Sequence, residues 1–535
     1  MDQRLKALFE PVKLRGLELK NRLVMAPMHT KFASETGEVT DRLVAYLTER
    51  ARGGVGLIVL ENTCIDWIHG RPAGNPVTLH DDMCRSGMST IPLAVHRHGV
   101  RIVTQLQHTG RQNVRANIPG GQAPLAPSAV KSLRGGDEPR VMDEADIERV
   151  ITMFVDGARR SREAGFDGVE LHGAHGYLLT QFFSPHTNRR TDKWGGSLSN
   201  RARFPLEVVR RIRAEVGRDF PLLYRLSAEE RIPGGTTLED SLILVRLLEE
   251  AGVDCFDVSV GIYDSIDQIY TMQGQAPGGL LPLAEAVKRV TSKPVIGVSR
   301  LGWNLDCAAR AVEEGRIDLA TIGRSLLADA YLPKKYYTGF RQEIVPCLAC
   351  NECIGMMERS LQLHCVVNPL LSYEYQNPIR PAAKSKTVLV IGGGPAGMQC
   401  AVTAAIRGHR VTLIEKEDSL GGQLLAATRV TEKAAEIGAL VAYFEHMLKK
   451  HGVETRTGLE ITSVQDMKMK PDVVVLAVGA SANHPRFPGA ERVITAFDML
   501  KNDGQNTGTR IAVIGASGVG IDAALYLTQT KGREV

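Results

Sequence analysis

The sequence predicts an α/β protein: an N-terminal (β/α)8 TIM barrel followed by Rossmann-like dinucleotide-binding domains, the last one incomplete. Three observations lead to this fold class. Over residues 1–340, eight short apolar runs alternate with helical patterns, as in barrels built from βα units. At residue 387 an apolar run enters a glycine-rich turn and a helical pattern, and a weaker copy of this arrangement starts at residue 510. We therefore expect domains at 1–340, 387–508 and 509–535, with a connecting segment at 341–386.

The overall composition argues against several classes of protein. The 535 residues are 43% hydrophobic and 23% charged with a net charge of +5, and no dense Lys/Arg run indicates a nucleic-acid or membrane-surface partner. No apolar stretch approaches the ~18–20 residues that span a bilayer, and the N-terminal residues lack the apolar core of a signal peptide. Nine cysteines in so long a chain argue against a disulfide framework. We therefore expect a cytoplasmic protein that acts on a small molecule.

Each barrel strand is predicted from a short run of apolar residues. The runs lie at residues 23–28, 56–61, 101–106, 168–173, 222–227, 255–260, 294–299 and 319–324. The stretch 107–145, rich in Gly, Pro and Arg, is the longest expected insertion. It is predicted to form a lid or a small hairpin.

Polar side chains gather at the ends of these strands, which is where barrels of this kind carry their active sites. Any one of these residues alone could simply cap a loop, but their joint placement indicates an active site. The polar candidates are Thr30, Gln105, His172, His175, Tyr177, Arg225, Arg300 and Arg324, and Met28 and Gly323 stand beside them at strand ends.

Four cysteines lie close together in the connecting segment: Cys347, Cys350, Cys353 and Cys365. Their spacing is C-x2-C-x2-C followed by eleven residues and the fourth cysteine. Three closely spaced thiolates match bacterial iron–sulfur runs, whereas zinc sites usually group their ligands in two separated pairs. We therefore expect an iron–sulfur cluster at residues 341–386, between the two α/β halves.

The turn after residues 387–391 has the features of a dinucleotide site. Gly392, Gly394 and Gly397 allow a tight turn and a close approach of the backbone to a pyrophosphate. Glu415, at the end of the next apolar run, is placed to bind a ribose hydroxyl. Gln423 belongs to a second glycine turn that is suited to lie near the nucleotide.

The copy at residue 510 is weaker because Ser517 stands where the middle glycine would be. Only one helical pattern follows before Val535, so this domain is expected to be incomplete. We expect the start of an NAD(P)H-binding domain, and a turn without a ligand is the alternative.

These segments, in this order, resemble the old-yellow-enzyme-like iron–sulfur flavoproteins, the family of 2,4-dienoyl-CoA reductase, 2-enoate reductase and trimethylamine dehydrogenase. The most specific segments are APMHT (26–30), QLQHTGR (105–111), residues 172–204, the cysteine run and the first glycine turn. The resemblance covers essentially the whole chain. It implies FMN in the barrel, a 4Fe-4S cluster beside it, and FAD or ADP with NAD(P)H in the C-terminal half. Barrels of this family often associate through their outer helices, so a homo-oligomer is compatible with it.

The resemblance also assigns residues to the flavin. Gln105 and Arg225 are implied to contact the pyrimidine edge, where Arg225 would stabilise the negative charge of the reduced ring. The residues implied to lie along the ring are Pro27, Met28 and Thr30. The residues implied to hold the FMN phosphate are Arg300, Gly323 and Arg324.

The resulting prediction is an NAD(P)H-dependent ene-reductase. Hydride from FMN N5 would reach the β-carbon of an activated C=C bond in an enone, enoate or enoyl thioester. Tyr177 would protonate the α-carbon, and His172 and His175 would bind the substrate carbonyl oxygen.

Two alternatives stay open at this point. An amine dehydrogenase or N-demethylase would oxidise a methylated amine at the flavin and pass electrons out through the cluster. Such a cation needs an aromatic cage or a carboxylate. Residues after strands five and six that could provide one are Tyr263, Tyr270, Asp264, Glu229 and Glu230. The other alternative is a non-enzymatic scaffold with a zinc knuckle and an inactive nucleotide domain.

Overall fold

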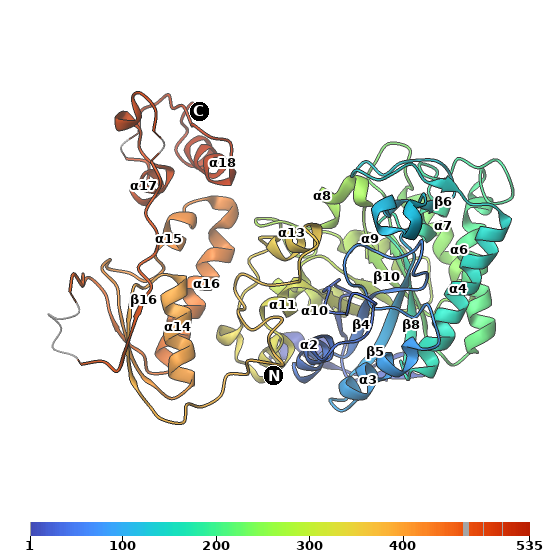
Figure 1. Cartoon of the computed structure of the whole chain (residues 1–535), viewed down its shortest axis with the longest axis horizontal. Helices are drawn as coiled ribbons and strands as arrows, with labels where there is room; N and C mark the ends of the chain where they lie inside the picture. Colours follow the sequence, from blue (N-terminus) through green and yellow to red (C-terminus); the bar gives the residue numbers. More distant parts are fainter. Residues whose placement is uncertain (1, 464–469, 485, 506) are drawn as a thin grey trace. The chain divides into compact units, whose positions relative to one another are not determined.

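The computed structural model describes residues 2–463, 470–484, 486–505 and 507–535. They form two compact units, and Figure 1 labels many of their helices and strands. Of the described residues, the first unit contains 2–272, 276–340 and 350–376, and the second contains 273–275, 341–349 and those that follow residue 376. The connecting segment expected at 341–386 is thus divided between the two units.

The first unit contains a closed barrel of eight parallel strands, which confirms the predicted (β/α)8 fold. The strands follow one another around the barrel in chain order, and each overlaps a predicted run. They are β3 (Leu23–Met25), β4 (Leu57–Cys64), β5 (Arg101–Gln107), β8 (Gly168–Gly173), β9 (Leu222–Ser227), β10 (Cys255–Ser259), β11 (Val295–Gly297) and β12 (Leu319–Ile322).

Helices follow the strands and surround the barrel (Figure 1). The principal ones are α2 (Asp41–Arg52), α3 (Cys84–His96), α4 (Glu144–Glu163), α6 (Leu198–Val216), α7 (Leu238–Ala251), α9 (Leu281–Lys288), α10 (Leu305–Glu313) and α12 (Leu332–Thr338). In the described part of the chain, no helix has both the length and the apolar character needed to cross a membrane.

Local sequence explains how these elements are bounded. β8 and β9 are buried along their whole length, because a barrel strand is covered by side chains inside and by helices outside. α4 begins at a capping box, in which the side chains of Asp143 and Asp146 each accept from the other's backbone N–H. α7 ends at Gly252, whose φ of 116° is one that residues with a side chain rarely adopt.

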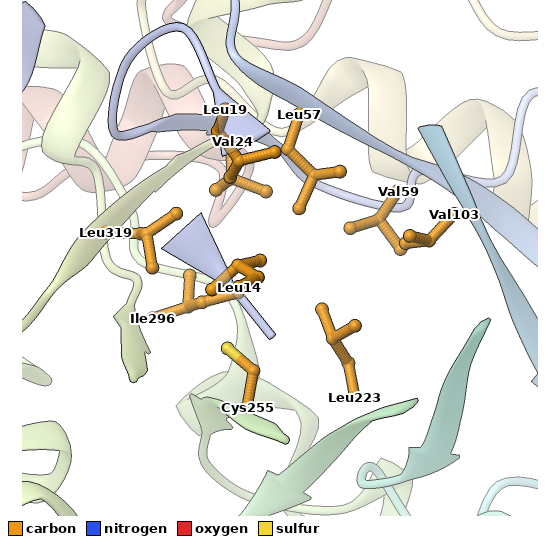
Figure 2. Close-up of a cluster of buried hydrophobic side chains, with 10 residues drawn as sticks. All are labelled: Leu14, Leu19, Val24, Leu57, Val59, Val103, Leu223, Cys255, Ile296 and Leu319. Atoms are coloured by element: carbon orange, nitrogen blue, oxygen red, sulfur yellow. The ribbon is translucent and has the colours of Figure 1, made fainter. Parts of the chain in front are cut away.

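A short hairpin closes the end of the barrel where the strands begin. It consists of β1 (Val12–Leu14) and β2 (Leu17–Leu19). Leu14 and Leu19 pack with buried side chains from the first residues of the barrel strands, as Figure 2 shows. Burying one such leucine stabilises the fold by roughly 1.5–3 kcal/mol. The opposite end, where the strands finish, is the end that carries the predicted site.

The 107–145 insertion contains three 3-10 turns and two short strands, β6 (Leu125–Ala126) and β7 (Arg140–Val141). These strands pair in parallel, so the expectation of a small hairpin is wrong. The buried Arg111 ties the insertion to the barrel. Its guanidinium donates to the Lys131 carbonyl at 2.6 Å and is paired with Asp264.

The second unit contains a four-stranded parallel sheet in the order β15-β14-β13-β16. These strands are β13 (Thr387–Ile391), β14 (Arg410–Ile414), β15 (Glu454–Arg456) and β16 (Val473–Leu476). Helix α14 (Pro395–Ile406) connects β13 to β14, and α16 (Thr431–Lys450) precedes β15. In chain order, the strands of this sheet are therefore arranged third, second, first and fourth. This is the strand order of a dinucleotide-binding half, which confirms the Rossmann-like prediction.

The C-terminal residues pack onto this unit. Buried side chains of α18 (Gly518–Leu525) lie against those of α15 (Gln423–Ala427) and α17 (Ala496–Lys501). The apolar run at 511–514 has no strand partner among the described residues, although Arg510 forms an isolated bridge with Glu534.

Candidate active site at the barrel mouth

The three residues predicted to be catalytic lie together at the end of β8. The ring centroids are 5.2 Å apart for His172 and His175, and 4.6 Å apart for His172 and Tyr177. His175 adopts a left-handed φ of 58°. Its N–H donates to Ser227 Oγ at 2.9 Å, and its Nε2 lies 2.7 Å from Ser259 Oγ. The ends of β9 and β10 therefore fix the position of the His175 ring.

Burial determines the protonation of these three side chains. Removal from water lowers the pKa of His172 and of His175 well below the usual value, and the nearby Arg225 charge lowers both further. Both rings are therefore neutral, and each carries one N–H donor. Burial raises the pKa of Tyr177 above its usual value, and the Tyr177 hydroxyl lies 2.9 Å from that of Tyr263. Tyr177 thus keeps its proton at physiological pH.

A buried cluster of charged and amide groups lies in β5, β8, β9 and β10. Gln105 Nε2 donates to Glu170 Oε1 at 2.8 Å. Arg225 of β9 is paired in strand register with His172 of β8 and with Asp257 of β10. Its Nε lies 3.4 Å from Asp257 Oδ2. The two residues assigned to the flavin pyrimidine edge, Gln105 and Arg225, are thus each held by a buried acid.

Burial favours the neutral forms of the two acids of this cluster. Burial, together with a smaller effect of the nearby Asp257 carboxyl, raises the pKa of Glu170 to about 8. Burial also raises the pKa of Asp257 above its usual value. Because burial favours the neutral form of each acid and two carboxylates in one buried site do not both ionise readily, the positive charge of the Arg225 guanidinium is only partly offset. A reduced flavin ring needs such a charge close to its pyrimidine edge.

Several buried polar atoms at this end of the barrel have no hydrogen-bond partner among the described residues. They are His29 Nε2, both polar side-chain atoms of Gln107, His172 Nδ1 and Thr321 Oγ1. Buried polar groups are nearly always satisfied in folded proteins, so a bound polar molecule is expected to supply their partners. A flavin carries donors and acceptors along one ring edge, and these residues fit such a group.

The loop after β3 brings Pro27, Met28 and Thr30 to the same end of the barrel. A Cβ placed on Gly323 would lie 3.5 Å from Met28 Sδ, so these two predicted flavin contacts are neighbours. Thr30 is held by the buried Glu61 of β4, which accepts hydrogen bonds from the Thr30 N–H and, at 3.2 Å, from Thr30 Oγ1. Burial raises the pKa of Glu61 to about 8.

The residues expected to hold a phosphate follow β11 and β12. The Arg300 guanidinium donates to the Met272 carbonyl at 3.1 Å. Gly323 immediately precedes Arg324, whose guanidinium donates to the Asn351 side-chain oxygen. Both guanidinium groups therefore have protein partners here, and their contact with a phosphate stays a prediction.

The first glycine turn has the close packing that its sequence predicted. Gly392 has a φ of 108°, and a Cβ there would lie 2.2 Å from the Ala477 carbonyl oxygen. A Cβ on Gly397 would lie 1.9 Å from the Gly392 oxygen. Gly394 stands at the N-cap of α14. Only residues without side chains allow this approach of strand, turn and helix.

The residues predicted to complete the nucleotide site are brought to the same turn. The Gly393 N–H donates to Glu415 Oε2 at 2.6 Å. The Gly421 N–H donates to the Gly393 carbonyl at 2.9 Å, which places the second glycine turn beside the first. Gln423 follows this second turn and donates to the Ala480 carbonyl at 2.9 Å. Contact of Glu415 or Gln423 with a nucleotide stays a prediction.

The turn at residue 515 repeats the packing of the first turn. Gly515 has a φ of 110°, and a Cβ on Gly520 would lie 1.8 Å from the Gly515 carbonyl oxygen. Ser517 stands at the N-cap of α18. The weaker sequence pattern therefore still folds into the same kind of turn.

The cysteine run is divided between the two units: Cys347 belongs to the second, and Cys350, Cys353 and Cys365 to the first. The residues before and after Cys350 adopt left-handed conformations, with φ of 48° and 59°, so the chain turns sharply around it. Among the described residues, no three His, Cys, Asp or Glu side chains are grouped as ligands for a metal ion. Four thiols in one stretch still have the chemistry of a cluster's donor set, and the cluster stays a prediction.

Three buried acids of the site were not predicted: Glu61, Glu170 and Asp257. Glu170 and Asp257 lie inside predicted barrel strands between apolar neighbours, and Glu61 is the last residue of another predicted strand. Carboxyl groups are rarely buried without a partner, so an acid within an apolar run is the sequence feature that could have identified them.

A barrel mouth of this kind, joined in one chain to a dinucleotide-binding unit, defines a flavin-dependent oxidoreductase. Comparison with known families agrees with that class. Residues 7–343 match the NADH:flavin oxidoreductase / NADH oxidase family, and residues 386–535 match the pyridine nucleotide-disulphide oxidoreductase family. The chain belongs to the NADH:flavin oxidoreductase / NADH oxidase family, as its sequence motifs predicted. The two matches imply FMN at the barrel and FAD with NAD(P)H in the C-terminal half.

Known relatives are similar over nearly the whole chain. An NADH oxidase of Thermoanaerobacter brockii is 42% identical, over 99% of this chain and 82% of the relative. A cinnamate reductase of Clostridium sporogenes is 34% identical, over 100% of this chain and 83% of the relative. A solved structure of 2-naphthoyl-CoA reductase in complex with 2-naphthoyl-CoA matches with a TM-score of 0.94 at 33% identity, over 99% of this chain and 82% of that chain.

Proposed function

We propose that this enzyme reduces the C=C bond of an activated alkene, such as an enone, enoate or enoyl thioester, at the barrel mouth. The observation that carries the proposal is a cluster of three side chains, in which the neutral His172 ring contacts both the neutral His175 ring and the protonated Tyr177 ring. Together these side chains provide donors for a substrate carbonyl oxygen and an acid for a substrate carbon. The cinnamate and 2-naphthoyl-CoA reductases among the similar proteins support the same reaction type.

The two histidines are proposed to bind the substrate carbonyl oxygen. FMN, when bound, supplies the hydride for the β-carbon of the alkene. His175 already has Ser259 as a neighbour of its Nε2, whereas His172 Nδ1 has no partner among the described residues. A donor from each ring would stabilise the negative charge that develops on the carbonyl oxygen as the alkene is reduced.

Tyr177 is proposed to deliver the proton to the α-carbon. Its buried hydroxyl stays protonated until an enolate-like carbon accepts that proton. The Tyr263 hydroxyl, 2.9 Å away, can then donate to the Tyr177 oxygen. This hydrogen bond would offset part of the energy needed to form a buried phenolate.

Amine oxidation, the alternative, has weaker support at this site. Of the three carboxylates that could attract a cation, Asp264 and Glu229 are paired with arginines, and burial raises the pKa of Glu230, which favours its uncharged form. From that candidate set only the rings of Tyr263 and Tyr270 remain for a cationic substrate. We therefore favour alkene reduction.

We also propose that FAD or ADP binds at the first glycine turn, that NAD(P)H is the electron donor, and that Cys347, Cys350, Cys353 and Cys365 bind a 4Fe-4S cluster. The packing of the glycine turns supports the nucleotides, and the donor chemistry of four thiols supports the cluster. The cytoplasmic location and the homo-oligomer stay predictions.

Anaerobic stopped-flow mixing tests the reaction. Holoenzyme reduced with NADH or NADPH should be reoxidised by enones, enoates or enoyl-CoA thioesters, and His172→Ala or His175→Ala should slow this step. His98→Ala, which changes a histidine at the other end of the barrel, is the matched control. Turnover of methylated amines with an artificial acceptor, combined with no reoxidation by any alkene, would exclude the proposal.

Iron and sulfide analysis tests the cluster. The purified holoenzyme should contain about four iron and four sulfide per chain. Cys350→Ser should lower both, whereas Cys84→Ser, which changes a cysteine outside the run, should not. Zinc in place of iron and sulfide would identify a zinc knuckle instead.

A further inference from the structure

An ion pair joins the 107–145 insertion to the helix that carries Cys353. Arg134 Nη2 lies 2.7 Å from Glu358 Oε2, and Arg134 Nη1 lies 3.3 Å from Glu358 Oε1. Glu358 is the last residue of α13 (Glu352–Glu358). Both side chains are about one-third exposed, at 37% and 36%. Exposed pairs of this kind are weak, so another anion can compete for the guanidinium.

Both halves of the ion pair are anchored beside the active site. On the insertion, the Leu133 N–H and Ser132 Oγ donate to Asp264 Oδ1 at 3.0 and 3.3 Å. Asp264 directly follows Tyr263, whose hydroxyl contacts the Tyr177 hydroxyl. On the helix, the Met357 carbonyl accepts from Lys31 Nζ at 2.6 Å, and Lys31 follows the predicted flavin loop.

The electrostatic effect of the pair reaches the tyrosines of the site. Burial raises the pKa of Tyr177, Tyr263 and Tyr270, and the Glu358 carboxylate raises all three further. The Arg134 guanidinium lowers the pKa of Tyr263 and Tyr270. A substrate lying against these rings would therefore be within range of both charges.

The neutral histidines provide no positive charge for a carboxylate substrate, and the arginine of this ion pair can provide one. If the carbonyl group of the substrate belongs to a carboxylate, its negative charge needs a cation, and neither His172 nor His175 provides one. The Arg225 charge lies in the barrel interior, where it is assigned to the pyrimidine edge of the flavin. Arg134 has the fork of donors that matches a carboxylate, and its present partner is a carboxylate on a partly exposed helix end.

We infer that Arg134 exchanges Glu358 for the carboxylate of the substrate, so that the site selects α,β-unsaturated carboxylates over uncharged enones. This inference rests on the proposed alkene reduction and names the substrate class. Glu358 acts as a competitor for the guanidinium and is displaced when an anionic substrate binds.

Cinnamate and benzylideneacetone are suitable probes, because they share a phenyl-substituted alkene and differ in a carboxylate and a methyl ketone. Their Kd values for the oxidised holoenzyme are measured by the change in flavin absorbance, and their KM and kcat values by anaerobic turnover. Arg134→Gln should raise the Kd and KM of cinnamate by about tenfold or more, because a charge-assisted hydrogen bond is lost, and should change those of benzylideneacetone by less than about twofold. Glu358→Gln should lower the Kd of cinnamate and leave that of benzylideneacetone unchanged.

Arg140→Gln is the matched control, because Arg140 lies on the same insertion and is paired with Asp146 instead. Equal effects of Arg134→Gln on both probes, or no effect on either, would overturn the inference. If the wild-type enzyme reduces neither probe but its affinity for cinnamate still depends on Arg134, carboxylate recognition stands, and the proposed reaction is decided separately by the stopped-flow test with the other alkenes. Both single variants change partly exposed side chains, so folded protein is expected for each.

Discussion

Glu61→Gln is expected to make the stability of the barrel against unfolding less dependent on pH. Glu61 is buried in β4, and both of its oxygens face Thr30, a predicted flavin contact. A glutamine has the shape of the protonated acid. Its oxygen can accept from the Thr30 N–H and its amide can donate to Thr30 Oγ1, so the variant should keep the geometry while removing the ionisation.

The size of the effect follows from the pKa of Glu61. Burial raises it from 4.5 to about 8, whereas the unfolded chain should titrate near the lower value. Below the lower value both states are protonated and no penalty exists. As the pH rises toward 8 the unfolded state loses its proton first, so the folded state is progressively destabilised. With about 1.4 kcal/mol per pH unit, the loss reaches about 3 kcal/mol at pH 7.

Thermal unfolding of the holoenzyme between pH 5 and 9 measures this loss. Other buried acids destabilise both proteins in the same direction, so the quantity to compare is the difference in Tm between variant and wild type. That difference should grow between pH 5 and 8 and reach about 5 °C in favour of Glu61→Gln. Glu35→Gln, which changes an exposed acid in the loop after β3, should follow the wild type.

A constant difference in Tm across this pH range would refute the reasoning, because it would mean that Glu61 titrates alike in the folded and unfolded states. The same conclusion would follow if Glu35→Gln shifted the curve as much as Glu61→Gln did. That result would indicate an effect of overall charge and not of burial.

Three further predictions concern the proton donor, the first glycine turn and the β1–β2 hairpin that closes one end of the barrel. Tyr177→Phe should slow alkene-dependent reoxidation by about 10²–10⁴-fold in stopped-flow measurements and leave reduction by NADH unchanged. Gly397→Ala should abolish nucleotide binding to the C-terminal half, measured as bound adenine nucleotide per chain, because the new Cβ would lie 1.9 Å from a backbone oxygen; Gly438→Ala, where a Cβ meets nothing within 4 Å, should bind normally. Leu14→Ala should destabilise the barrel by about 2–5 kcal/mol in denaturant titration, whereas Leu93→Ala, at an exposed position, should have little effect.

The parts of the fold that were predicted are those that local patterns determine. Each barrel strand is a short apolar run, and a parallel strand buried on both faces requires such a run. The turns at Gly392 and Gly515 were predicted because close backbone packing requires glycine at particular spacings. The parallel pairing of β6 and β7 was missed because two-residue strands carry no periodicity.

The parts of the site that were missed depend on residues far apart in the chain. Arg134 and Glu358 are separated by 224 positions, and neither has a neighbour in sequence that indicates the other. The same holds for Glu61, which lies 31 positions after Thr30. Only the closed barrel brings the ends of its strands and the cysteine-bearing helix to one place.

Buried acids connect these observations to the chemistry. An ionised carboxylate beside a flavin would oppose the negative charge of the reduced ring, so acids at this position are useful only if burial keeps them neutral. Glu170 meets this condition, because burial raises its pKa to about 8 while its neighbour Arg225 keeps a charge for the ring. The Glu358 carboxylate is partly exposed, and it is paired with an arginine. The site therefore combines acids whose neutral form is favoured by burial with one carboxylate, Glu358, that a substrate can displace. In the inferred scheme, the displacement of Glu358 allows Arg134 to recognise a carboxylate substrate.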